Sequence, residues 1–213
     1  MITFVDIGAR GGIKQKWRLI RDQLKVVCFE PNPEEQENLR KQVWWEDAVI
    51  IPSGLWCVKG TINLYITENP GLTSVYKLSP KMVGRLSAND FKVVKTIRMP
   101  VNTLDSYDLK PDFIKLDTQG SELEILKGAE ESLKTTTCIE CEVEFEEVYD
   151  GQGLFCDIHA FLLARGFTLW GITTRYLSGT RATLFGDGVW FRDGTEGERK
   201  REIIEGVYLD KGI

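Results

Sequence analysis

The chain alternates short apolar runs with stretches of helical pattern, and three of the apolar runs end in an acid. The first run leads to Asp6, the second to Glu30 and the third to Asp117. Helical patterns follow them over residues 14–22, 34–42 and 122–133. Alternation of this kind is typical of βαβ units, so the pattern predicts a mostly parallel sheet with the three acids at the carboxyl ends of its strands.

The rest of the pattern assigns further elements. Strands are expected over residues 48–55, 61–67, 92–101, 135–145, 167–173 and 183–192, and a helix over 154–165. The strand over 92–101 contains Pro100 and is expected at a sheet edge, and the last two strands are expected to pair antiparallel at one edge. Residues 69–89 are rich in loop formers and are predicted to contact the substrate. Gly128, within the helix over 122–133, indicates close packing.

The bulk composition favours one α/β domain over residues 1–213. A chain of this length with 42% apolar residues can bury a sizeable core. Its net charge is −5 and it has no run of five basic residues, which argues against a nucleic-acid partner. No apolar stretch approaches the roughly 18 residues of a membrane span. The first residues lack the pattern of a leader, so a cytoplasmic location is expected.

The five cysteines are odd in number and scattered, which fits a reducing compartment rather than a disulfide framework. Cys138 and Cys141 form a CxxC within the strand over 135–145, where residues three apart point to opposite faces. Buried apolar cysteines are therefore favoured over a metal site. His159, the only histidine, lies beside apolar helix positions and is expected to be a packing or surface residue.

The first apolar run breaks into a turn that carries Gly8, Gly11 and Gly12. A strand that ends in this way before a helix leaves backbone N–H groups facing a small-molecule pocket. Glu30 lies 24 positions after Asp6, where a carboxylate can accept both hydroxyls of an adenosine ribose. This signal is shared by NAD enzymes and by methyltransferases that use S-adenosylmethionine.

The spacing of the glycines separates these two cofactors. A dinucleotide fingerprint needs glycine two positions after its first glycine, and this chain has Arg10 or Ile13 there. The pyrophosphate of NAD is therefore disfavoured. S-adenosylmethionine carries no phosphate but has an ammonium and a sulfonium group, for which Asp6 and other carboxylates supply compensating charge.

Four motifs carry a resemblance to a known family. They are Val5-Asp6-Ile7-Gly8-Ala9 with Gly12, Phe29-Glu30-Pro31-Asn32-Pro33, Thr103-Leu104-Asp105, and the segment 114–129 that contains Asp117-Thr118-Gln119-Gly120-Ser121-Glu122. In this order they resemble the FkbM-type methyltransferase family. The resemblance implies a class I methyltransferase fold, which is Rossmann-like, with a seven-stranded sheet and helices on both faces. It also implies S-adenosyl-L-methionine as methyl donor, S-adenosylhomocysteine as product, and usually a hydroxyl acceptor on a sugar, polyketide or similar small metabolite.

The resemblance also assigns site residues. It implies that the methionine end of the cofactor is held by Asp6, Gly8 and Gly12, and that Glu30 binds the ribose and Asn32 the adenosine edge, with Ala9, Arg10 and Pro31 beside them. The adenine ring would lie beside Ser53, Gly54 and Leu55. Asp117 would lie near the methyl group. The implied partner is a small-molecule or glycan acceptor, and no metal is implied.

Three features depart from the usual pattern of the family. Arg10 stands where the family commonly has Asn, so a cation is available there to the methionine carboxylate or to an acidic acceptor. Gln119 stands near a position that is commonly acidic. The chain also begins almost at its first strand, whereas many members have a preceding segment that helps to cover the cofactor. The cover is therefore expected from residues 69–89 or from a partner chain in a homo-oligomer.

The implied chemistry is in-line attack of an acceptor oxygen on the sulfonium methyl, for which positioning and a general base both contribute. Asp117 is the first candidate for the base and Glu142 the second. Glu142 belongs to a row with Glu140 and Glu144 on one side of their strand, and a solvated row at a sheet edge is the alternative interpretation. Two other functions stay open. One is an NAD-dependent oxidoreductase, which is disfavoured because the chain lacks a Tyr-x-x-x-Lys arrangement. The other is a non-catalytic cofactor-binding module.

Overall fold

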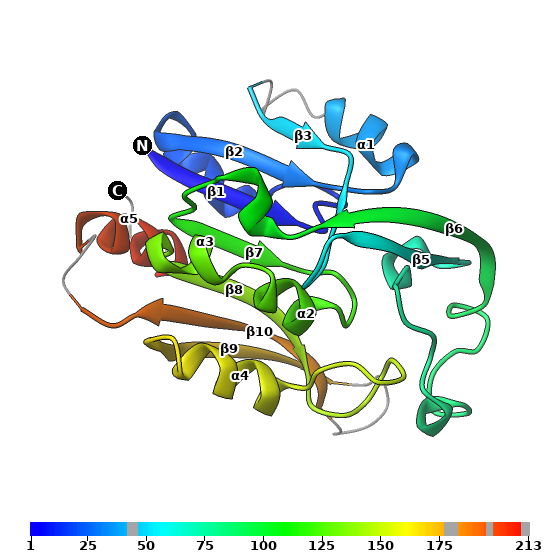
Figure 1. Ribbon diagram of the computed structural model, residues 1–213. Coiled ribbons are helices and arrows are strands. Elements are labelled where there is room, and N and C mark those ends of the chain that lie inside the picture. The colour runs from blue at the N-terminus through cyan, green and yellow to red at the C-terminus, as the bar shows by residue number, and fades with distance from the viewer. Residues whose placement is uncertain (42–46, 177–182, 195–197, 210–213) are drawn as a thin grey trace.

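The computed structural model describes residues 1–41, 47–176, 183–194 and 198–209. Seven strands form its central sheet: β1 (Ile2–Ile7), β2 (Leu24–Phe29), β3 (Val49–Ile51), β7 (Phe113–Leu116), β8 (Cys138–Glu144), β9 (Phe167–Tyr176) and β10 (Thr183–Arg192). Their order across the sheet is β3-β2-β1-β7-β8-β10-β9 (Figure 1). The first five strands in this order are parallel, whereas β10 is antiparallel to both β8 and β9. The predicted parallel sheet with an antiparallel edge pair is confirmed.

Helices and 3₁₀ helices cover both faces of this sheet, as predicted. One face packs against η1 (Gln15–Gln23), α1 (Pro33–Arg40) and α5 (Glu198–Tyr208). The other packs against η5 (Leu104–Tyr107), α2 (Glu122–Lys127), α3 (Glu130–Thr135) and α4 (Phe155–Leu163), and the last three lie in front of the sheet in Figure 1. Cys138 and Cys141 belong to different core clusters, which confirms that they point to opposite faces. None of the described helices is long and apolar enough to cross a membrane.

A second sheet, of three strands, extends beyond the carboxyl ends of the parallel strands (Figure 1). It consists of β4 (Gly54–Leu55), β6 (Val93–Asn102) and β5 (Gly60–Thr67), in that order. Leu64, Met99 and Val101 form its core. The connection from β5 to β6 contains the 3₁₀ helices η3 (Pro70–Leu72) and η4 (Pro80–Met82). We call residues 60–102 the cap.

Two strand predictions are wrong in this region. The strand expected over 48–55 divides into β3 and β4, which belong to different sheets, because Pro52 lacks the N–H that would continue the hydrogen-bonded ladder. β6 is the middle strand of its sheet and not an edge strand. Pro100 is tolerated there because β4 pairs with β6 only at Val101 and Asn102, which leaves one side of the strand open at Pro100.

The helix predictions also need correction. Residues 15–23 form a 3₁₀ helix with a kink at Ile20, and its buried side chains, Trp17 and Ile20, are three residues apart. That spacing matches a helix with three residues per turn. The helix expected over 122–133 is broken at Gly128 into α2 and α3. α5 has no counterpart among the predicted elements, and Gln42, the last residue of the helix expected over 34–42, lies outside the described residues.

Gly128 packs where no side chain fits, as its place in the helix predicted. A Cβ there would lie 2.3 Å from the carbonyl oxygen of Trp56. We expect Gly128→Ala to lower the free energy of unfolding by about 1–3 kcal/mol, the usual cost of overpacking, as measured by urea denaturation. Gly60→Ala is the matched control, because a Cβ at Gly60 would meet nothing within 4 Å. Equal losses in the two variants would contradict the steric explanation.

Candidate active site

A cavity of about 680 Å³ lies between the carboxyl ends of the parallel strands and the cap. The ends of β1, β2 and β7, with residues 53–55, line one side of it. Residues 70–73 and 85–87 of the cap line another side, together with Glu142 and Glu144 of β8. Part of the segment 69–89, which was predicted to contact the substrate, is therefore cavity wall.

The turn after β1 lies directly against the end of β7. Gly8 has a φ of 76°, and its N–H donates to the carbonyl oxygen of Phe29 at 3.1 Å. A Cβ at Gly8 would lie 2.1 Å from the carbonyl oxygen of Asp117. Gly11 and Gly12 have φ values of 78° and 74°, in the region that favours glycine. The predicted cofactor turn and Asp117 are therefore in contact.

Asp6 is fully buried and pairs with Lys115 on the neighbouring strand. Lys115 Nζ lies 3.1 Å from Asp6 Oδ1 and 3.6 Å from Asp117 Oδ2. Burial raises the pKa of Asp6, and the Lys115 ammonium opposes that shift. Asp6 Oδ2 has no hydrogen-bond partner among the described residues. Asp6, Ala9 and Gly12 are not part of the cavity wall, so their direct contact with a cofactor stays a prediction.

Glu30 lines the cavity at the end of β2. Its Oε1 accepts from the N–H of Asn32 at 2.8 Å. The side chain of Asn32 in turn accepts from the N–H of Glu34 at 3.1 Å and caps α1. Burial is the main cause that raises the pKa of Glu30 to about 7. The carboxyl group is therefore fixed at the cavity wall with an unusually high proton affinity.

The predicted adenine neighbours lie together on the same side of the cavity. Ser53, Gly54 and Leu55 all line it, as does Pro31, for which no contact with the adenine was predicted. The Ser53 hydroxyl donates to the carbonyl oxygen of Gly54 at 2.9 Å. A Cβ at Gly54 would lie 2.6 Å from Met99 Cε. The core of the cap is thus packed directly on the strand that would face the adenine.

Arg10 lies between α1 and the cap, at the wall of the cavity. Its Nε is 3.2 Å from Glu35 Oε1, and its side chain is 47% exposed. A Cβ at Gly71 would lie 3.3 Å from Arg10 Nη1. The sequence left open whether this cation serves the cofactor or the acceptor. In the structure it is paired with Glu35 and touches the cap turn that contains η3.

Gln119 stands at the centre of the acidic end of the cavity. Its Nε2 donates to Glu142 Oε2 at 2.5 Å and to Asp117 Oδ1 at 3.2 Å. Its Oε1 accepts from the Tyr149 hydroxyl at 2.7 Å. Its φ of 59° lies in the left-handed region, which is costly for a residue with a side chain and is concentrated at functional sites. The two predicted catalytic acids are therefore close together, and the amide of Gln119 joins them.

The three glutamates of β8 are buried, with exposed fractions of 3%, 8% and 3% for Glu140, Glu142 and Glu144. The alternative of a solvated row is therefore wrong. Burial raises the pKa of Glu142 to about 10, and the carboxylates of Asp117 and Glu144 add to the rise. Burial likewise raises the pKa of Glu144. Burial thus favours the uncharged form of both carboxyl groups, and the pKa of about 10 leaves Glu142 uncharged at neutral pH.

Glu140 lies farther from the cavity, and its pKa is shifted in the opposite direction. Lys14 Nζ and Lys16 Nζ lie 2.6 and 3.0 Å from its two carboxylate oxygens, and the Tyr208 hydroxyl donates to it. Burial would raise the pKa of Glu140, but the two ammonium groups outweigh it and lower that pKa to about 2. One strand therefore carries an ionised glutamate, Glu140, at its centre and an uncharged one, Glu142, near the cavity.

Lys115 and Tyr149 are site residues that sequence reasoning did not assign. Lys115 carried a signal, because a lysine inside an apolar run of a central strand needs a buried partner. Tyr149 carried no such signal. His159 accepts a hydrogen bond at Nδ1 from Trp190 Nε1 at 3.2 Å and stacks on Phe155, which confirms a packing role.

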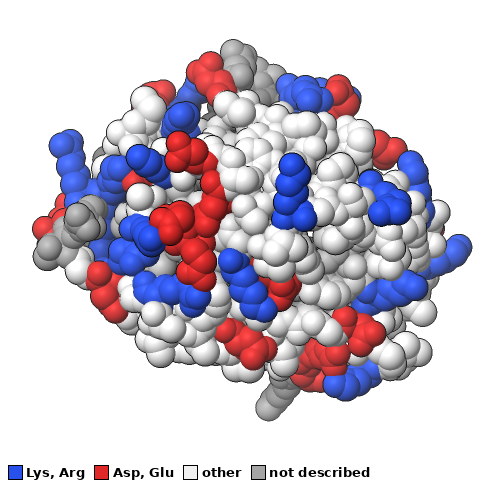
Figure 2. Space-filling view, viewed as in Figure 1, with Lys and Arg blue, Asp and Glu red and all other residues white. Residues whose placement is uncertain are grey.

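Two further features bear on the class of ligand. Within the described part of the chain, no group of three or more His, Cys, Asp or Glu residues could hold a metal ion. On the face shown in Figure 2, Lys and Arg side chains lie among Asp and Glu side chains. This face does not present the continuous basic patch that is typical of a nucleic-acid interface.

Comparison with known proteins gives one family and several distant likenesses. A model described as the methyltransferase FkbM domain matches residues 6–169. The 2-O-methyltransferase NoeI of Sinorhizobium fredii is 24% identical over 163 residues, which are 70% of this chain and 66% of NoeI, slightly less than two thirds of its length. The S-adenosylmethionine-bound magnesium protoporphyrin IX methyltransferase of Synechocystis PCC 6803 has a TM-score of 0.48 at 9% identity, covering 91% of this chain and 70% of that one. The putative RNA methyltransferase PH1948 of Pyrococcus horikoshii has a TM-score of 0.46 at 10% identity, covering 89% and 74%.

We expect Lys115→Met to lower the free energy of unfolding by about 3–5 kcal/mol at pH 7, because it leaves Asp6 buried without its cation. Burial then raises the pKa of Asp6 unopposed, so the folded variant binds a proton more tightly than the unfolded chain. The loss of stability should therefore shrink as the pH falls from 7 to 5. Urea denaturation at several pH values measures both effects.

Lys200→Met is the control for the Lys115 variant. Lys200 Nζ pairs with Asp112 Oδ1 at 2.7 Å, but its side chain is 42% exposed. Loss of such a pair should cost less than about 1 kcal/mol. A destabilisation of Lys115→Met that does not change with pH would rule out the ion pair as its cause.

Proposed function

Because this chain belongs to the FkbM methyltransferase family, whose methyl donor is S-adenosylmethionine, we propose that it methylates a hydroxyl group of a small molecule or glycan. One observation carries the proposal. A single cavity is lined both by Gly8 and Glu30, at the ends of β1 and β2, and by the acids Asp117 and Glu142. A donor and an acceptor bound in it would therefore be neighbours.

The residues of the cavity fit the chemistry of the cofactor. The strand ends contribute the Glu30 carboxyl group and the Gly8 turn, with Ser53 and Leu55 farther along. We propose that Glu30 accepts hydrogen bonds from the ribose, that residues 53–55 flank the adenine, and that the Gly8 turn receives the methionine end. When bound, S-adenosylmethionine supplies a methyl group on a positively charged sulfur. Asp6, Ala9 and Gly12 shape the turn from behind the cavity wall.

The acidic end of the cavity supports acid–base roles for two residues. Asp117 is 37% exposed at its side chain, and its Oδ2 lies 3.6 Å from the Lys115 ammonium. We propose that Asp117 accepts the proton of the acceptor hydroxyl. Glu142, with a pKa of about 10, would instead donate a hydrogen bond to the acceptor. This assignment replaces the earlier hypothesis that Glu142 is an alternative base.

The dimensions of the cavity support a small acceptor group. About 680 Å³ falls within the range of about 300–1,000 Å³ that is typical of small-molecule sites. The name of the relative NoeI, a 2-O-methyltransferase, supports oxygen as the atom that is methylated.

We also propose that residues 1–213 form one domain. β3 ends at Ile51 and β4 begins at Gly54, so the chain passes from the first sheet to the second within two residues.

Asp117→Asn should lower turnover by about 10²–10⁴-fold, the usual contribution of a general base, without weakening the binding of S-adenosylhomocysteine. Turnover is measured as S-adenosylhomocysteine formation with a panel of phenols and neutral sugars. Glu142→Gln is the matched control, because an amide can still donate the hydrogen bond of an uncharged carboxyl group. It should keep most of the activity, and a larger loss in Glu142→Gln than in Asp117→Asn would reverse the two roles.

Calorimetry separates the remaining alternatives. Binding of S-adenosylhomocysteine at micromolar concentration without binding of NAD is the expected result. Binding of NAD alone would overturn the proposed function in favour of an oxidoreductase. Tight cofactor binding that Asp117→Asn leaves unchanged, with no turnover of any acceptor by the wild-type chain, would favour a non-catalytic module.

The affinity for S-adenosylhomocysteine should fall as the pH drops through 7. The pKa of Glu30 in the free protein is raised to about 7, and ribose hydroxyls bind its ionised form. Affinity should therefore be full above pH 7 and should fall by up to about 10-fold per pH unit below it. Calorimetry between pH 5 and 8 measures this slope. Glu30→Gln should bind more weakly and without the pH dependence, and a parallel slope in that variant would exclude Glu30 as its source.

A further inference from the structure

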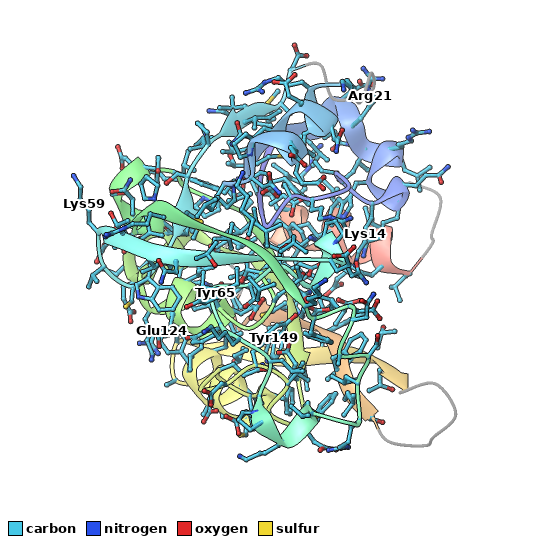
Figure 3. The ribbon with its side chains drawn as sticks, turned by 90° about the vertical axis from the view of Figure 1, so that its right-hand side faces the viewer. Lys14, Arg21, Lys59, Tyr65, Glu124 and Tyr149 are labelled. Carbon is cyan, nitrogen blue, oxygen red and sulfur yellow. The ribbon has the colours of Figure 1, made fainter. Side chains whose placement is uncertain are left out.

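Residues 74–79 of the cap, which we call the cap strip, join the second sheet to the loop that carries Tyr149. At one end Ser74 pairs with Tyr65 of β5 through two backbone hydrogen bonds of 2.8 and 3.2 Å. At the other end the N–H of Ser79 donates to the carbonyl oxygen of Val148 at 2.8 Å. Figure 3 labels Tyr65 and Tyr149, the two residues between which the cap strip runs.

Ser74 is the residue of the cap strip that contacts the acidic end of the cavity. It is 1% exposed, and its hydroxyl donates to the main-chain carbonyl of Gln119 at 2.6 Å. The same hydroxyl accepts from the N–H of Tyr76 at 3.0 Å. One buried side chain therefore links the cap to the turn after β7, across 45 positions of sequence.

The contact is made to the residue whose backbone is strained. Gln119 has a φ of 59°, and a non-glycine residue keeps such a conformation only where its surroundings impose it. Ser74 holds the main-chain oxygen of Gln119, and the Tyr149 hydroxyl holds its side-chain oxygen at 2.7 Å. Ser74 and Tyr149 thus hold the two ends of one residue, and Tyr149 is itself paired with Leu78 of the cap strip.

The position of Gln119 determines how the two acids are presented. Its Nε2 donates to Asp117 Oδ1 at 3.2 Å and to Glu142 Oε2 at 2.5 Å. If the turn relaxed to negative φ, the side chain would leave this place and both carboxyl groups would lose a donor. We propose that Ser74 is a positioning residue for methyl transfer. It holds Gln119 in its left-handed conformation, so the arrangement of Asp117 and Glu142 depends on the position of the cap against the turn after β7. This inference rests on the proposed function of the same site.

Ser79 supplies a matched comparison within the cap strip. It is also 1% exposed, and its hydroxyl accepts from the N–H of Lys81 at 3.3 Å and caps η4. Ser79→Ala therefore removes an equally buried hydroxyl from the same segment. The hydroxyl of Ser79 bonds within the cap, to Lys81, and not to the turn after β7. Ser74→Thr keeps a hydroxyl where Ser74→Ala removes it.

The first experiment needs no acceptor. The side-chain amide of Gln119 is followed by ¹⁵N NMR in the complex with S-adenosylhomocysteine and is assigned by its disappearance in Gln119→Glu. Ser74→Ala should shift this signal and speed hydrogen exchange at residues 117–120, whereas Ser79→Ala should leave both unchanged. An unshifted Gln119 signal in folded Ser74→Ala would overturn the proposal, whatever the fate of the proposed reaction.

The second experiment uses turnover. Ser74→Ala should lower kcat by about 10-fold, the change expected when one buried hydrogen bond is lost, with little change in the KM for S-adenosylmethionine. Ser74→Thr should recover most of kcat, and Ser79→Ala should leave kcat unchanged even if it lowers Tm. Equal losses of kcat in the two alanine variants would mean that both serines only stabilise the cap, and would overturn the proposal.

Discussion

The contact between Gly8 and the carbonyl oxygen of Asp117 is the constraint on which the rest of the site depends. Two strand ends approach so closely there that a Cβ on Gly8 would lie 2.1 Å from that oxygen. Behind the contact, the buried pair of Asp6 and Lys115 joins the same two strands. The contact and the ion pair thus fix the ends of β1 and β7 relative to each other. One of these ends carries the turn that would receive the cofactor, and the other carries the acid that would receive the acceptor's proton. Proximity of this kind supplies much of the rate of a two-substrate reaction.

Charged neighbours give the buried glutamates of one strand different charges. Glu140 and Glu142 are two positions apart on β8, yet two lysines keep the first ionised, whereas the neighbours of the second are carboxylates. Because Glu142 is uncharged, there are fewer negative charges near Asp117 than the number of acidic residues there suggests. Gln119 also limits the number of carboxyl groups near Asp117, because a glutamate in its place would add another one to the cluster. Under the proposed function, two carboxyl groups, those of Asp117 and Glu142, thereby take the different roles of proton acceptor and hydrogen-bond donor.

The sequence was sufficient for the features that depend on local pattern. Asp6, Glu30 and Asp117 could be placed at strand ends because each follows an apolar run, and the family could be recognised from the motifs around them. The cap sheet could not be predicted, because the alternation in β5 indicates a buried face but not what buries it. Lys115 and Gln119 stood out in the sequence, but the residues that they contact could not be identified from it. Their partners lie 109 and 23 positions away, and only the register of neighbouring strands brings them together.

The cap enters and leaves the fold as a single excursion of the chain, between β4 and η5. Its interior packs on itself through Leu64, Met99 and Val101, while the central sheet keeps its own two cores. Substitutions in residues 70–73 and 85–87, which line the cavity away from the contact of Met99 with Gly54, would leave the ends of β1, β2 and β7 in place. Under the proposed function, residues 60–102 form a segment in which the acceptor could change, provided that Ser74 and the pairing around Tyr149 are retained. Divergence of acceptor range within such a lineage would be concentrated in residues 60–102, while the strand ends drift slowly.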